Sequence, residues 1–119
     1  MDIETYREYC LSKPGVTEAF PFDNETLVFK VSGKIFALGN ITDFKSVNLK
    51  CDPAKAIELR EEFDAVIPGF HMNKKHWNTI IFEGSISWKK LKEWIDHSYT
   101  LVVESLSKKD REALKGLHS

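Results

Sequence analysis

Two histidines, two lysines and two asparagines crowd into residues 68–78, between a Pro-Gly turn and an apolar stretch. Side chains of these types can bind a metal ion, hold a phosphate or form a solvated loop. His71 and His76 have no Cys, Asp or Glu between them, whereas a tight zinc site usually needs three protein ligands. We therefore expect no metal and no other cofactor here. In the alternative interpretation, His76 is structural and hydrogen-bonds to the backbone where a strand begins.

Lys74 and Lys75 are the stronger candidates for binding in this segment. Adjacent cations beside a turn can contact phosphate without being buried. His71, Asn73 and His76 flank them and belong to the same candidate nucleic-acid-binding surface. The simpler alternative, a solvated lysine pair with no ligand, remains open.

Charge is distributed in bands along the chain, although the net charge is only −1. Residues 30–50 carry a net charge of +3 and residues 71–92 of +4, whereas residues 1–29 and 51–70 carry −4 and −3. If the fold brings the basic bands together, they form one positive surface that can neutralise phosphates. Alternatively, these lysines protect an exposed sheet from aggregation. The candidate phosphate contacts are Lys30, Lys50, Lys74, Lys75 and Lys89.

The composition is that of one globular domain spanning residues 1–119. Hydrophobic residues make up 42% of the chain and charged residues 29%, and this length can bury a core without disulfide or metal staples. No apolar run is as long as a transmembrane helix, and no signal-peptide core precedes the first helix, so we expect a cytoplasmic protein without membrane contacts. Cys10 and Cys51 are then expected to be reduced thiols.

Hydrophobic periodicity and turn residues predict an α+β fold in the order α-β-β-β-α-β-α, an antiparallel sheet with helices packed on one face. Asp52 is expected to cap a helix that begins at Pro53, and Ser87 to cap the long helix that follows it. The expected elements are a helix ending near residue 12, strands over 27–31, 35–38, 47–51 and 77–82, helices starting at 53 and 88, and a short last helix after 107.

Period-two alternation within the strands assigns side chains to the two faces of the sheet. Lys30, Asn48 and Lys50 are predicted to share the polar face. Trp77 is expected to pack in the core, although an aromatic beside cations can also stack on unpaired bases. The predicted core contains Phe29, Val31, Leu49, Ile81, Leu91, Trp94 and Ile95.

The run Pro-Gly-aromatic-His-Met-x-Lys-x-His-Trp, followed by a helix that carries Ser98-Tyr99-x-Leu101-Val102, resembles the MmcQ/YjbR family of small bacterial proteins. Two positions depart from the family pattern, because Phe70 stands where tyrosine is usual and Ser107 where proline often begins the last turn. The resemblance covers nearly the whole chain. It implies a compact, frataxin-like (CyaY-like) sandwich and DNA binding through a double-wing arrangement.

Nothing in the sequence assembles into a catalytic set, so we expect no enzyme. Ser98 has neither a nucleophile elbow nor a partner base near it in sequence, and the glycines sit in isolated turns rather than in a phosphate-binding loop. The favoured function is DNA binding, mainly through phosphates and with low sequence specificity. The alternative is a protein or peptide interaction module that binds an acidic partner, with an aromatic anchor near Trp77.

Overall fold

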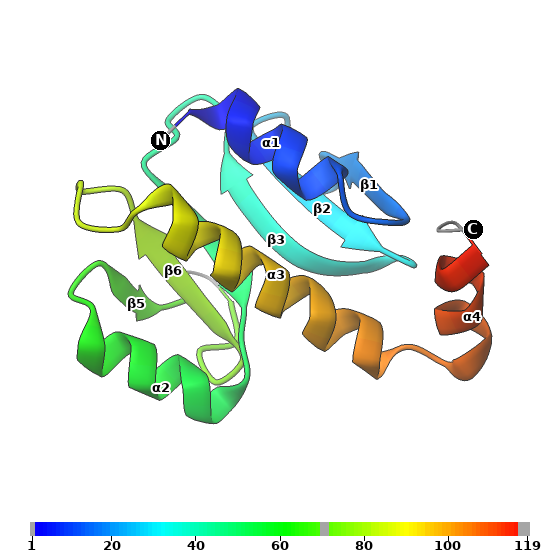
Figure 1. The fold of residues 1–119 in the computed structure, drawn as a ribbon. Helices are drawn as coiled ribbons and strands as arrows, with labels where there is room; N and C mark the ends of the chain where they lie inside the picture. The colour runs from blue at the N-terminus through cyan, green and yellow to red at the C-terminus, as the bar shows by residue number, and fades with distance from the viewer. Residues whose placement is uncertain (1, 70–71, 117–119) are drawn as a thin grey trace.

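Six strands form one antiparallel sheet in the computed structural model, which describes residues 2–69 and 72–116 (Figure 1). The strands are β1 (Val16–Ala19), β2 (Thr26–Val31), β3 (Lys34–Asn40), β4 (Ser46–Lys50), β5 (Val66–Pro68) and β6 (Trp77–Ile81). The helices are α1 (Ile3–Leu11), α2 (Pro53–Glu62), α3 (Trp88–Ser105) and α4 (Lys108–Gly116). In the sheet the strands lie in the order β1-β2-β3-β4-β6-β5.

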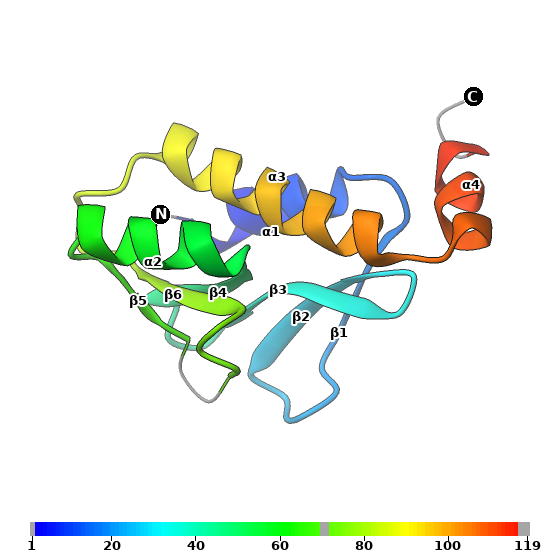
Figure 2. The same ribbon diagram turned by 90° about the horizontal axis from the view of Figure 1, so that it is seen from below.

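Helices α1, α2 and α3 cover the same face of this sheet, as Figure 2 shows from the side. Helix α4 lies beyond the end of α3, at one end of the molecule. None of the helices in the described part of the chain lies over the opposite face, which we call the uncovered face. The β1–β2 connection projects from it, as do the described residues of the β5–β6 connection. The predicted α+β architecture, with an antiparallel sheet and helices on one face, is therefore confirmed.

The helix caps expected from the sequence are formed. The side chain of Asp52 accepts a hydrogen bond from the Lys55 amide at 3.2 Å, and Pro53 occupies the first turn of α2. The Ser87 hydroxyl accepts from the Lys90 amide at 3.1 Å and starts α3. Each bond satisfies one of the backbone N–H groups that the first turn of a helix leaves unpaired.

A tight turn and a β-bulge set the geometry of the β2–β3 hairpin. Ser32 and Gly33 both have positive φ angles, of 49° and 79°, as the favoured two-residue hairpin turn requires. The register then shifts between Phe29 and Lys30, so that the extra residue on β3 is Phe36. The bulge lets Phe36 remain fully buried, with its ring edge-to-face against Tyr99.

The core lies between the sheet and the three covering helices. Six of the seven predicted core residues belong to it, namely Phe29, Val31, Leu49, Leu91, Trp94 and Ile95. The prediction for Ile81 is wrong. In β6 it is Ile80 that pairs with Val47 and faces the helices, whereas Ile81 pairs with Ser46 on the uncovered face.

Both cysteines are buried free thiols. Desolvation raises the pKa of Cys10 to about 12 and that of Cys51 to about 11. Neither is a thiolate near neutral pH. In the part of the chain that the structure describes, no helix is long and apolar enough to cross a bilayer.

Candidate nucleic-acid interface

The strand register gathers Lys30, Asn48 and Lys50 on the uncovered face. Asn48 pairs with Leu38, which in turn pairs with Val28, so these three side chains point to the same side. Lys30 and Lys50 follow two residues after Val28 and Asn48 on their own strands and share that side. The predicted common face is thereby confirmed.

Asn73 organises the loop that carries the lysine pair. Its side-chain oxygen accepts from the Lys75 amide at 2.9 Å, and its carbonyl oxygen accepts from the His76 amide at 3.2 Å. The Lys74 ammonium donates to the Gly69 carbonyl oxygen at 3.2 Å, and both Lys74 and Lys75 are exposed. The His76 carbonyl oxygen accepts from the Cys51 amide at 2.8 Å, which ties the loop to the end of β4. His71, the fifth candidate in this segment, lies outside the described residues.

Arg60 on α2 hydrogen-bonds to this loop, a role that no sequence motif indicated. Its Nε donates to the side-chain oxygen of Asn78 at 2.7 Å, and its Nη2 donates to the carbonyl oxygens of Lys74 and Trp77. Asn78 is almost fully buried and donates in turn to the Ala56 carbonyl oxygen at 3.3 Å. A buried network thus fixes the lysine-bearing loop against α2.

The lysines of this surface have no carboxylate partners among the described residues. The ion pairs in that part of the chain are Arg7–Glu18, Lys13–Asp96, Lys45–Asp43 and Lys90–Glu93. The charges of Lys30, Lys50, Lys74 and Lys75 are therefore available to an anion. Lys89, the remaining candidate, lies in the first turn of α3 in the helical layer, so the fold does not bring it to the uncovered face.

A second, smaller apolar cluster lies on the uncovered face itself. Trp77 belongs to it together with Val28 and Leu38, and Met72 packs against them. Trp77 is therefore buried as expected, but on the side of the sheet opposite to the main core. Because only 9% of its surface is exposed, its ring is not open for stacking on a ligand.

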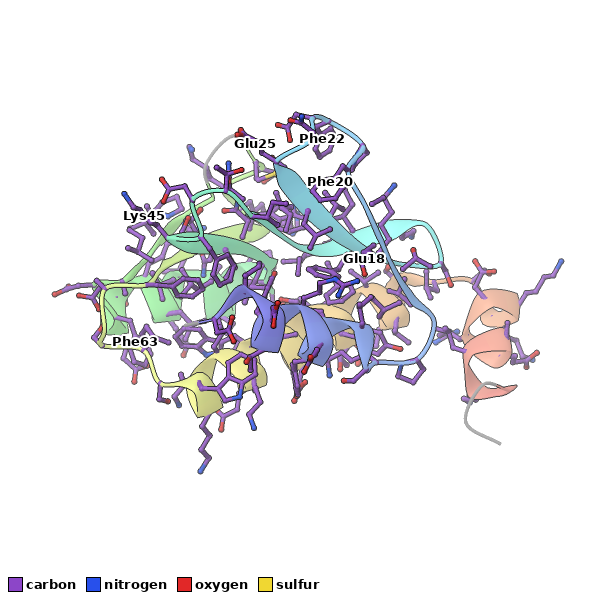
Figure 3. The ribbon with its side chains drawn as sticks, turned by 90° about the horizontal axis from the view of Figure 1, so that it is seen from above. Glu18, Phe20, Phe22, Glu25, Lys45 and Phe63 are labelled. Atoms are coloured by element: carbon purple, nitrogen blue, oxygen red, sulfur yellow. The ribbon has the colours of Figure 1, made fainter. Side chains whose placement is uncertain are left out.

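A hollow of about 400 Å³ opens beside this cluster. Its floor is the uncovered face of β2, β3 and β4, and its rims are the β1–β2 and β5–β6 connections. The lining residues are Phe22, Thr26, Leu38, Gly39, Asn40, Ser46, Asn48 and Met72. Phe22 is 67% exposed and stands at the tip of the β1–β2 connection, away from the helices (Figure 3). Sequence reasoning missed Phe22 and Asn40 as site residues.

The charges around this hollow are not uniform. The β1–β2 connection, which supplies Phe22, also carries Asp23 and Glu25, both exposed, whereas the β5–β6 connection, which supplies Met72, also carries the lysine pair. Asp23 accepts hydrogen bonds from the backbone amides of Glu25 and Thr26, and these bonds lower its pKa. One rim is therefore acidic, and the other is basic.

Comparison with known proteins identifies the family of this chain. The YjbR family model matches residues 11–101, most of its length. The chain belongs to the YjbR family. It is 37% identical to the Escherichia coli O157:H7 protein YbdF over 94% of this chain and 93% of that one. It is 31% identical to the E. coli K12 protein YjbR, over 96% and 98% of the two chains. Both relatives are described as uncharacterized proteins.

Two solved structures share this fold. The crystal structure of Deinococcus radiodurans protein DR2400, a DUF419 domain, has 38% sequence identity and a TM-score of 0.88, and the match covers 95% of this chain and 87% of that one. A Pseudomonas syringae protein solved by crystallography has 26% identity and a TM-score of 0.70, over 85% and 98% of the two chains. Family membership is therefore supported by both sequence and structure.

Ser98 and His97, on the helical side, hydrogen-bond to backbone groups. The Ser98 hydroxyl donates to the carbonyl oxygens of Lys50 and Trp94. Nε2 of His97 accepts from the Asp52 amide at 3.2 Å. Across residues 2–69 and 72–116, no three His, Cys, Asp or Glu side chains meet where they could hold a metal ion.

The pKa of His97 predicts a pH dependence of stability. Desolvation and, secondarily, the positive charge of Lys55 lower this pKa in the folded protein, against the opposing effects of Asp52 and Glu104. The unfolded chain then binds a proton more readily, so folding is favoured above the ordinary histidine pKa of about 6.5 and loses this contribution as pH falls below it.

We expect the free energy of unfolding, measured with urea between pH 7.5 and 5, to fall toward acid less steeply in His97→Gln than in the wild type. The other three histidines are present in both proteins and serve as the internal control. Equal slopes would remove His97 from the pH dependence.

Proposed function

We propose that the uncovered face binds DNA, chiefly through its phosphates, and that it does so without catalysing a reaction. The observation that supports this function is the convergence of Lys30 and Lys50, from two strands, on the uncovered face of the sheet. Lys74 and Lys75 add charge from the adjoining loop. Several unpaired cations on one surface create the positive potential that attracts a phosphate backbone.

Sequence readout by this surface is expected to be weak, because base edges are read best by bidentate arginine and amide side chains on an inserted element. Arg7 is paired with Glu18, and Arg60 is occupied by the loop network. Arg111 lies on α4, away from the uncovered face. Phosphate contacts therefore dominate the proposed interaction.

The test is a titration of random-sequence DNA at several salt concentrations. Lys30→Ala/Lys50→Ala and Lys74→Ala/Lys75→Ala should each weaken binding on every sequence and make the slope of log K against log salt shallower by up to about 2. The matched control is Lys108→Ala/Lys109→Ala, which removes the same charge from exposed, adjacent positions on α4. That control should bind nearly as the wild type does.

Three results would contradict the proposal: no binding of the wild type at low salt, equal losses in all three double variants, or unchanged affinity in both test variants. Binding of poly-glutamate, without binding of DNA, would instead establish the alternative of an acidic protein or peptide partner.

A further inference from the structure

We infer that the hollow on the uncovered face holds an unpaired base of single-stranded DNA, with the ring of Phe22 stacked on it. This inference rests on the proposed DNA-binding function and specifies the form of DNA that the surface takes. It follows from the size of the hollow, the chemistry of its lining and the opposite charges of its rims.

The size of the hollow suits a nucleotide. About 400 Å³ lies within the roughly 300–1,000 Å³ typical of pockets that enclose small organic ligands. Among the described residues, the lining contains no charged side chain, and Leu38, Met72 and Phe22 supply apolar surface. A flat, uncharged group with polar edges fits this lining better than a phosphate does.

The amides on the floor can donate to such a group. The side-chain oxygen of Asn40 accepts from the Thr42 and Asp43 amides at 2.8 and 2.9 Å, and that of Asn48 accepts from the Thr79 hydroxyl. No hydrogen bond within the described ranges uses either Nδ2 group, so both can donate to a ligand. Carbonyl oxygens on a base edge, such as those of thymine, are suitable acceptors.

The acidic residues beside Phe22 favour single-stranded DNA over duplex DNA as the ligand. A phosphate next to Phe22 would lie on the connection that also carries the exposed carboxylates of Asp23 and Glu25, and like charges repel. A duplex carries phosphates on its outside and would press some of them against this rim. A single strand can turn its bases inward and keep its phosphates toward the lysines.

Lys50 lies close enough to the hollow for one DNA strand to contact both. Lys50 lies two residues beyond Asn48 on the same face of β4, which corresponds to roughly 7 Å at the rise of a strand. A nucleotide with its base in the hollow therefore has its phosphate within reach of Lys50. Exposed aromatics beside such cations are the stacking platforms of single-strand binding proteins.

The test compares oligo-dT with an abasic strand of equal length, which keeps the phosphates and removes the bases. The wild type should bind oligo-dT more tightly than the abasic strand, by about 5- to 100-fold for one stacked base. Phe22→Ala should lose most of this difference while binding the abasic strand as the wild type does. Phe22→Trp should retain the preference, because it keeps an aromatic face.

Phe20→Ala is the matched control, since Phe20 lies on the same connection, is 44% exposed and does not line the hollow. It should leave the preference intact. As a direct readout, the side-chain amide NMR signals of Asn40 and Asn48 should shift with oligo-dT and not with the abasic strand.

The outcomes separate the two proposals. If the wild type binds duplex, abasic strand and oligo-dT equally, the base site is disproved while the DNA-binding function stands. If Phe22→Ala weakens all three alike, Phe22 does not stack on a base and the inference fails. If no DNA binds even at low salt, the proposed function fails and this inference with it.

Discussion

Replacing Phe29 by alanine is expected to lower the free energy of unfolding by about 3 to 5 kcal/mol. Phe29 is fully buried in β2, between the sheet and the helices, and its ring packs edge-to-face against Tyr6 with centroids 5.6 Å apart. Removing the ring loses its transfer free energy and leaves a cavity that the surrounding strands cannot close. Urea unfolding monitored by circular dichroism measures the effect.

The matched control for Phe29 is Phe22, on the adjoining β1–β2 connection. Phe22→Ala removes the same ring from a position 67% exposed and should change stability by no more than about 0.5 kcal/mol. A loss below about 1 kcal/mol for Phe29→Ala would show that this side chain is not in the core.

The second large effect is expected for Arg60→Met, with a loss of about 1.5 to 3 kcal/mol. Methionine keeps much of the apolar stem but removes the hydrogen bonds to Asn78 and to the carbonyl oxygens of Lys74 and Trp77. Asn78 is 1% exposed, so water cannot easily replace the lost donor to its side-chain oxygen.

The same substitution should loosen the loop that carries the lysines. Hydrogen exchange of the His76 and Lys75 amides is expected to accelerate more than exchange in α3 does, because Arg60 no longer pins the loop. Arg111→Met, on the exposed surface of α4, is the control and should change stability by about 0.5 kcal/mol or less. If hydrogen exchange of the loop amides is unchanged, contacts other than those of Arg60 keep the loop ordered.

The central strands and long helices were predictable because their signals are local. Alternation in β2 and β4 correctly assigned Lys30, Asn48 and Lys50 to one face, and the caps Asp52 and Ser87 correctly located two helix starts. Each of these predictions needs only neighbouring residues and a fixed period.

The edge strands were missed because their formation depends on partners distant in sequence. β1 is a four-residue strand containing Glu18 and Ala19, both poor strand formers, and it is held by pairing with β2. β5 ends in Pro68, which a sheet tolerates at an edge, and Pro68 reads locally as a loop.

The composition of the surface was only partly predictable. Charge bands along the sequence grouped Lys89 with the other lysines, but a band cannot show that one member lies on a helix behind the sheet. Alternation also could not reveal that Trp77 and Ile81 face the side without helices, since a period of two leaves the identity of the covered face open. The exposure of Phe22 depends on how two distant connections fold, which no local pattern encodes.

The burial of both native thiols makes this protein a convenient host for site-specific probes. Cys10 and Cys51 are the two cysteines of the chain, and both are buried with raised pKa values. Maleimide reagents attack exposed thiolates, so we expect no labelling of the two native cysteines at neutral pH. A cysteine introduced at Phe20 or Lys75 would then carry a single fluorophore on a chosen rim of the hollow, without prior removal of any native residue.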